Sequence, residues 1–151
     1  MTREILAFAH SVSNVPVWVM GTSQGSIAAM NAASHTEHRE LTGVMLTESV
    51  SVLGKSQETV FDAHPQDVRV PALIVANRDD RCWVAPPSKA NEIAAAMRNA
   101  PSTVLFVEGG TARSSNECSS LSPHGYWGID DKVVGDIENW MLGASHFVER
   151  S

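Results

Sequence analysis

Four short runs of apolar and β-branched residues recur along the chain, separated by segments of different character. The runs occupy residues 15–20, 41–47, 70–76 and 103–107. Each is apolar almost throughout, without alternation of apolar and polar positions, which is typical of strands buried on both faces of a parallel sheet. The pattern therefore predicts a mostly parallel sheet of about four strands.

The segments between these runs carry apolar residues at helical spacing. Residues 26–33 are rich in alanine, and residues 4–10 predict a short helix or the end of one. A further helix is expected to open at Pro86, because proline fits the first turn of a helix, and residues 129–142 predict a final amphipathic helix. Strands alternating with helices predict the α/β class with helices flanking the sheet, and residues 1–151 are expected to form a single domain.

Composition and charge exclude several classes of function. The formal net charge is −6 and no cluster of Lys or Arg occurs, which argues against nucleic acid or an anionic membrane as partner. No apolar run has the length of a membrane span, and the first residues lack a signal peptide, so we expect a cytoplasmic protein. Cys82 and Cys118 alone cannot build a structural zinc site and are either free thiols or one disulfide. We expect no metal and no cofactor.

The most informative segment is residues 21–25, which read Gly-Thr-Ser-Gln-Gly between the first expected strand and the helix after it. A turn this sharp forces Ser23 into a strained backbone conformation with its hydroxyl at the apex. Side chains at Gly21 and Gly25 are expected to collide there, which would explain both glycines. The following helix would direct free N–H groups at an oxyanion formed beside Ser23. The alternative interpretation is a glycine-rich turn that only connects strand and helix.

Residues with catalytic chemistry also follow two later strands. Asp79 and Asp80 come after the third expected strand, and His124 lies in the long loop 111–128 after the fourth. Because parallel strands end at the same edge of a sheet, we expect these groups to gather beside Ser23. A serine becomes a good nucleophile when an imidazole takes its proton and a carboxylate orients that imidazole. The alternatives are a turn aspartate that caps a loop and a surface histidine.

In these features the chain resembles the C-terminal half of an α/β-hydrolase. The turn at 21–25 matches the nucleophile elbow of that family, and residues 71–80 match the strand and turn that carry its acid. Residues 122–126, Ser-Pro-His-Gly-Tyr, match its histidine loop. The three motifs occur in the order that the nucleophile-elbow fold requires, and the resemblance covers nearly the whole chain.

The resemblance implies a serine hydrolase that acts on a small ester or related acyl substrate. Ser23 would be the nucleophile, His124 the base, and Asp80 the acid, with Asp79 as the alternative acid. The backbone N–H of Gln24 would bind the oxyanion. The alternative function is that of a non-catalytic module that keeps the turn as a device of the fold and works through association with itself or with a partner.

The chain departs from the family pattern in supplying only four of eight strands. The loop that donates a second oxyanion N–H has no counterpart, and loss of one such donor typically costs about 10²–10³ in rate, so we expect a weak enzyme. The first strand would lie at an exposed edge of the sheet, which predicts a homodimer or other homo-oligomer formed across that edge. Alternatively, the sequence is a fragment of a longer protein.

The resemblance also makes neighbours of the two loops that carry cysteine. Cys82 follows the acid turn and Cys118 precedes His124, so we expect a disulfide that holds these loops together. Such a bond favours an exported protein, in conflict with the missing signal peptide.

Overall fold

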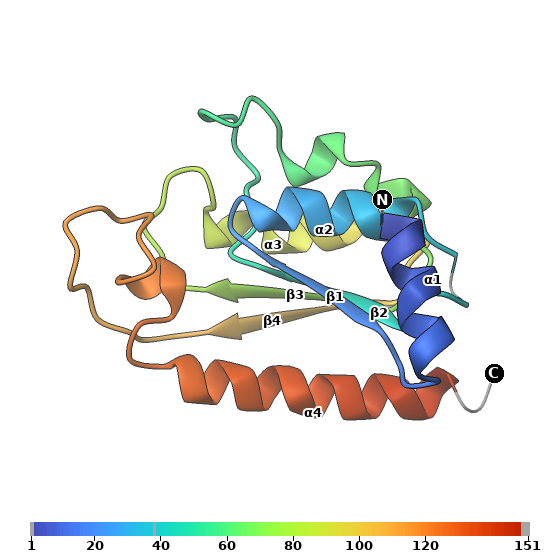
Figure 1. The fold of residues 1–151 in the computed structure, drawn as a ribbon. Helices are drawn as coiled ribbons and strands as arrows, with labels where there is room; N and C mark the ends of the chain where they lie inside the picture. Colours follow the sequence, from blue (N-terminus) through green and yellow to red (C-terminus); the bar gives the residue numbers. More distant parts are fainter. Residues whose placement is uncertain (1, 38, 149–151) are drawn as a thin grey trace.

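A computed structural model describes residues 2–37 and 39–148 of the chain. Its centre is a four-stranded, all-parallel sheet with the order β1-β2-β3-β4 (Figure 1). The strands are β1 (Trp18–Thr22), β2 (Gly43–Thr47), β3 (Ala72–Asn77) and β4 (Ser102–Val107). The predicted fold class, α/β with about four parallel strands flanked by helices, is confirmed.

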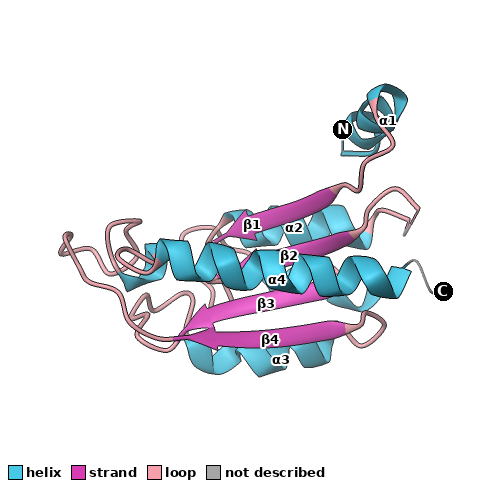
Figure 2. Cartoon of the chain, turned by 90° about the horizontal axis from the view of Figure 1, so that it is seen from below, coloured by secondary structure: helices cyan, strands magenta, loops and turns pink. Residues whose placement is uncertain are grey.

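Helices cover both faces of the sheet. They are α1 (Thr2–Val12), α2 (Gly25–Ser34), α3 (Ala90–Ala96) and α4 (Asp130–Val148), with single 3₁₀ turns at Val60–Asp62, Pro65–Asp67, Pro87–Lys89 and Pro123–Gly125. Helices α2 and α3 lie on one face and α4 runs along the other, while α1 stands beside the beginning of β1 (Figure 1 and Figure 2). Within the described ranges no helix is long and apolar enough to cross a membrane.

Side chains along the two central strands, β2 and β3, point alternately to the two faces of the sheet, so a hydrophobic core forms on each face. Val44 and Leu46 of β2 and Ile74 of β3 belong to the cluster that contains the α2 and α3 side chains, whereas Met45 and Leu73 belong to the cluster under α4. Every residue of both strands is buried. Because both faces are covered, these strands appear in the sequence as continuous apolar runs.

The first strand begins at Trp18 and not at residue 15, where the sequence predicted it. In the register of the sheet Trp18 lies opposite Gly43, and a Cβ on that glycine would lie 2.5 Å from the Trp18 ring. The glycine therefore lets the indole lie over β2, where it meets Trp140 of α4 edge to face at 5.5 Å. The register of β1 on β2 begins at this residue.

Candidate active site

The turn after β1 holds Ser23 in the left-handed backbone region, with a φ of 53°. For a residue other than glycine this conformation is uncommon and costs roughly 1–3 kcal/mol. The Ser23 N–H donates to the Thr47 carbonyl at 2.9 Å, which ties the turn to the end of β2. A Cβ on Gly21 would lie 2.2 Å from the Gly25 carbonyl oxygen, so the close approach of the chain to itself requires glycine at position 21.

The steric reason expected for Gly25 is wrong. A Cβ at that position would meet nothing within 4 Å, because Gly25 begins α2 and faces open space. Gln24, the residue before the helix, is exposed. Its backbone N–H donates to no other residue in the described part of the chain, so it is free to meet a ligand at the start of α2.

A continuous chain of hydrogen bonds joins Ser23, His124 and Asp80. The distance from Ser23 Oγ to His124 Nε2 is 2.8 Å, and His124 Nδ1 lies 2.7 Å from Asp80 Oδ2. Since a carboxylate only accepts hydrogen bonds, Nδ1 carries the proton that is donated to Asp80, and Nε2 accepts from the serine hydroxyl. The side chains of His124 and Asp80 are 3% and 0% exposed, so this hydrogen bond is shielded from water.

The two aspartates of the turn after β3 have different partners. Asp80 accepts from His124 through one oxygen and from the Cys82 N–H (2.7 Å) through the other. Asp79 instead accepts from the Gly109 N–H at 2.7 Å, and its own N–H donates to the Asn77 side chain at 3.0 Å. The structure therefore brings Asp80 to the histidine, while Asp79 fastens the turn to the segment after β4.

A disulfide and a pair of side-chain hydrogen bonds hold in place the loop that carries His124. The predicted disulfide is confirmed: Cys82 and Cys118 are bonded, at an S–S distance of 2.01 Å. The bond links the loop after Asp80 to the loop that leads to His124. On the other side, the Asn77 side chain donates to the carbonyls of Gly109 and Pro123, both at 3.0 Å. His124 thus lies on a loop that is fastened both to the end of β3 and to the turn that follows it.

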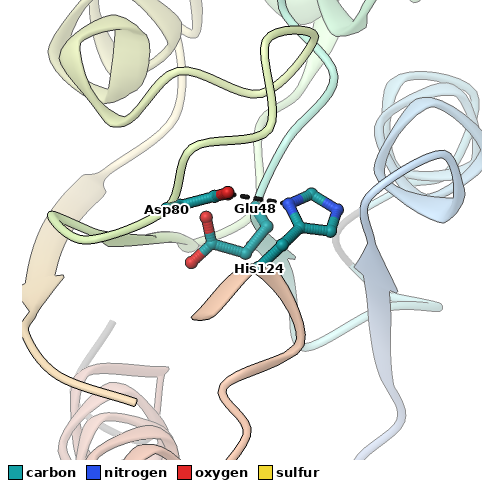
Figure 3. A group of neighbouring side chains, drawn as sticks. All are labelled: Glu48, Asp80 and His124. Carbon is teal, nitrogen blue, oxygen red and sulfur yellow. Dashed lines mark hydrogen bonds and ion pairs between the residues drawn. The ribbon is translucent and has the colours of Figure 1, made fainter. Parts of the chain in front are cut away.

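Glu48, directly after β2, is a site residue that the sequence analysis did not assign. It is 1% exposed, and its Oε1 accepts from the Asn77 N–H at 2.7 Å. A carboxyl oxygen of Glu48 lies within 4.8 Å of ligand atoms of both Asp80 and His124, and the three groups lie side by side in Figure 3. Burial, reinforced by neighbouring Asp80, raises the pKa of Glu48 to about 10. A carboxylate placed directly after a buried strand was the signal that could have found it.

Comparison with solved structures gives this arrangement a known fold. A monoacylglycerol lipase from Paleococcus ferrophilus matches with a TM-score of 0.61 and 13% identity, over 95% of this chain and 76% of the lipase. An acylaminoacyl peptidase from Pyrococcus horikoshii matches with a TM-score of 0.50 and 11% identity, over 81% of this chain and 23% of the peptidase. The protein has an α/β-hydrolase fold. The resemblance inferred from the motifs is confirmed at that level.

A third α/β-hydrolase structure, an acylaminoacyl peptidase in complex with Z-Gly-Gly-Phe-chloromethyl ketone, matches with a TM-score of 0.51 and 11% identity. The match covers 97% of this chain and 25% of that peptidase, so the chain spans about a quarter of the peptidases it resembles. No protein-family model and no curated protein matches the sequence.

In this α/β-hydrolase fold a cleft of about 400 Å³ opens beside Ser23. Trp83, Val50 and Val84 line it with apolar side chains, and Lys55 and Asn116 line it with polar ones. A second cleft of about 510 Å³, which includes Arg81, is lined by none of Ser23, Asp80 and His124. The cleft at the serine is therefore the place where a substrate would meet these groups.

The same fold places three potential metal ligands together, namely Glu48, Asp80 and His124. Both imidazole nitrogens already take part in hydrogen bonds, with Ser23 and Asp80. His124 could ligate a cation only by giving up one of those bonds. The hydrogen-bonded arrangement suits proton transfer to and from the serine.

Proposed function

We propose that this protein is a serine hydrolase that cleaves small ester or related acyl substrates with a Ser23–His124–Asp80 triad. The observation that carries the proposal is the unbroken chain of hydrogen bonds from the serine hydroxyl to a buried carboxylate. Its three members come from segments that follow three different strands, so their alignment depends on the fold and not on one local motif.

The proposed reaction follows from the proton positions in that chain. Ser23 Oγ attacks the acyl carbon while its proton passes to His124 Nε2, and Asp80 stabilises the imidazolium that forms. The carbon–oxygen bond to the leaving alcohol then breaks, and Nε2 returns the proton to that oxygen. Water attacks the acyl-enzyme by the same route and releases the acid and free Ser23.

Stabilisation of the oxyanion is expected to limit the rate. The Gln24 N–H stands at the start of α2, where the free amides and the positive end of the helix dipole favour negative charge. With this one backbone donor we expect a rate about 10²–10³ below that of an enzyme with two. Asn116, which lines the same cleft, is a candidate side chain for a second donor.

The cleft supports a small substrate with an apolar acyl or alcohol part. Trp83 is 63% exposed, and its ring would be covered by a bound apolar group. Burial of apolar surface contributes about 25 cal/mol per Å², so even partial cover of the indole stabilises the complex. Lys55 is the charged residue of this lining and lies where a polar substituent would meet water.

Covalent labelling with a fluorophosphonate tests the proposal directly. We expect one label per chain, found by mass spectrometry on Ser23 and absent from Ser23→Ala. The turn offers a matched pair of acid variants: Asp80→Asn should lower the labelling rate by on the order of 10⁴, because the imidazole loses its orienting carboxylate. Asp79→Asn should retain most of the rate. Folded wild-type protein that takes no label would refute the proposal.

Association through the β1 edge is the second candidate function, supported by exposed apolar surface. β1 lies at the end of the sheet order, with β2 as its neighbour. Large apolar side chains on and near it are at least half exposed: Ile5, Phe8, Val12, Val15 and Met20. Two copies of an exposed edge strand can pair antiparallel about a two-fold axis and remove both edges. We therefore propose a homodimer across β1.

Sedimentation velocity over a range of concentrations tests the dimer. A dimer that Met20→Lys converts to a monomer would support association at this edge, since a lysine on an edge strand opposes pairing. A concentration-independent monomer would remove the idea, whatever the outcome of labelling at Ser23.

We also propose that the protein works in an oxidising environment. A disulfide that closes a loop is typical of exported proteins, because the reducing cytosol opens such bonds. Alkylation of free thiols at the moment of cell lysis, followed by mass spectrometry of Cys82 and Cys118, gives the redox state in the cell. Alkylation of both cysteines would contradict the proposal.

A further inference from the structure

Glu48 occupies an unusual position for an acidic side chain. Its backbone φ is 44°, in the left-handed region, although it is not glycine. Its N–H donates to the Val75 carbonyl at 3.1 Å, which fixes it to β3. Glu48 is thus the counterpart of Ser23 on the next strand: both leave the sheet through a strained residue at the same edge, and such strain concentrates at functional sites.

The carboxyl group of Glu48 is satisfied on one side only. Oε1 accepts from the Asn77 N–H, whereas Oε2 is buried and has no hydrogen bond among the described residues. An ionised carboxylate in this position would leave a charged oxygen buried without a partner, which is a costly arrangement. A protonated carboxyl instead places a donor on Oε2, next to an acceptor.

The titratable groups that face Glu48 are Asp80, His124 and Tyr126. Burial is the main cause of the raised pKa of Glu48, and Asp80 raises that pKa further, first through a hydrogen bond to the protonated carboxyl and then through charge repulsion. Hydrogen bonds from Tyr126 and from the Asn77 N–H lower the pKa of Glu48 but do not offset these effects. Burial also raises the pKa of the Tyr126 hydroxyl, with a further contribution from Glu48, so the tyrosine stays neutral. One negative charge, on Asp80, then faces the imidazole.

We propose that Glu48 is a positioning residue that stays protonated in the folded protein and presents its Oε2 hydroxyl to the Asp80 carboxylate. The proposal rests on the proposed function, since it concerns how the acid of the triad is held. The hydrogen bond fixes the Asp80 carboxylate against His124. With Glu48 uncharged, Asp80 is the one carboxylate that faces the imidazole among these three side chains.

The first test compares Glu48→Gln with Glu48→Leu in the pH dependence of Ser23 labelling. Glutamine keeps an N–H donor and an oxygen for Asn77 without charge, so it should retain most of the rate and leave the acidic limb of the profile unmoved. Leucine removes the hydrogen bond to a charged group and should lower the rate by about 10–100-fold. Glu58→Gln, the same change at an exposed side chain, is the matched control.

Two results would overturn the proposal. If Glu48 is ionised, Glu48→Gln removes a negative charge near His124 and moves the acidic limb to lower pH. If the side chain positions nothing, Glu48→Leu labels as fast as the wild type, provided that its circular dichroism shows a folded protein.

A second measurement does not depend on activity or on a variant that folds. Wild-type protein labelled with ¹³C-glutamate should show the infrared carbonyl band of a protonated carboxyl at pH 7.5, where exposed glutamates are ionised. Absence of the band overturns the proposal. Failure of wild-type Ser23 to take the fluorophosphonate counts against the proposed function alone, since the band still reports the state of Glu48.

Discussion

A buried carboxyl that stays protonated makes the stability of the protein depend on pH in a distinctive way. In the unfolded chain a glutamate titrates near 4.5, whereas burial raises the pKa of Glu48 in the folded protein to about 10. Between those values the folded state binds one proton more than the unfolded state. Stability is therefore greatest below the unfolded pKa and falls as the pH rises toward the folded pKa.

The size of the effect follows from the linkage relation. One extra proton in the folded state lowers the free energy of unfolding by about 1.4 kcal/mol per pH unit. From pH 5 to pH 8 the loss amounts to roughly 4 kcal/mol, which is a large part of the stability of a typical domain. Glu48→Gln cannot ionise at this position, so its free energy of unfolding lacks this slope. Relative to the wild type, the variant should therefore become more stable by the same amount between pH 5 and pH 8.

Urea unfolding of oxidised wild type and of Glu48→Gln, at one-unit steps from pH 5 to pH 8, measures the difference. Other titrating groups contribute to both proteins and largely cancel, and any hydrogen bond that glutamine gains or loses changes the offset but not the slope. Glu58→Gln controls for the change in net charge. A wild-type-to-variant difference that stays constant from pH 5 to pH 8 would refute the reasoning, because it would mean that Glu48 ionises alike in both states.

A matched pair of glycine variants and a double cysteine variant test other parts of the site. Gly21→Ala should destabilise the fold by roughly 1–3 kcal/mol and abolish labelling, because its Cβ would press on the backbone of the turn, whereas Gly25→Ala should stay within about 1 kcal/mol of the wild type in urea unfolding. Equal losses for the two alanines would contradict the account of the turn. Replacing both Cys82 and Cys118 by alanine should lower the free energy of unfolding by about 4 kcal/mol for a separation of 36 residues. Native protein should show no reactive thiols, and two would contradict the disulfide.

Much of the fold could be predicted from the sequence because parallel strands under two helical layers must be apolar throughout. The sequence predicted the central strands within two residues at each end, since polar residues and proline bound their apolar runs. It misplaced the start of β1, where the apolar run begins before the pairing does. The start of β1 is set by its register with β2, which pairs Trp18 with Gly43, a residue far away in the chain.

The sequence could predict those site residues whose type, such as serine, aspartate or histidine, indicates catalysis when it occurs after an expected strand. The sequence left Asp79 open as the acid, because two adjacent aspartates in one turn look alike until the turn is folded. The turn assigns them different partners, since Asn77 accepts from the Asp79 N–H and Gly109 donates to its carboxylate. Glu48 was not singled out for a related reason. A single acidic residue after a strand becomes a candidate only when the fold brings it next to groups from the neighbouring strands, here Asp80 and His124.

The four parallel strands therefore contribute to the site in succession. Ser23 follows β1, Glu48 follows β2, Asp80 follows β3, and the loop with His124 follows β4. The first three lie within a few residues of a paired strand, so the backbone hydrogen bonds of the sheet fix their positions. His124 is separated from β4 by a long loop, so its position depends on the disulfide and on the Asn77 side chain. Opening the disulfide should therefore displace His124 more than Ser23, because nothing in the ladder of the sheet holds the imidazole against Asp80.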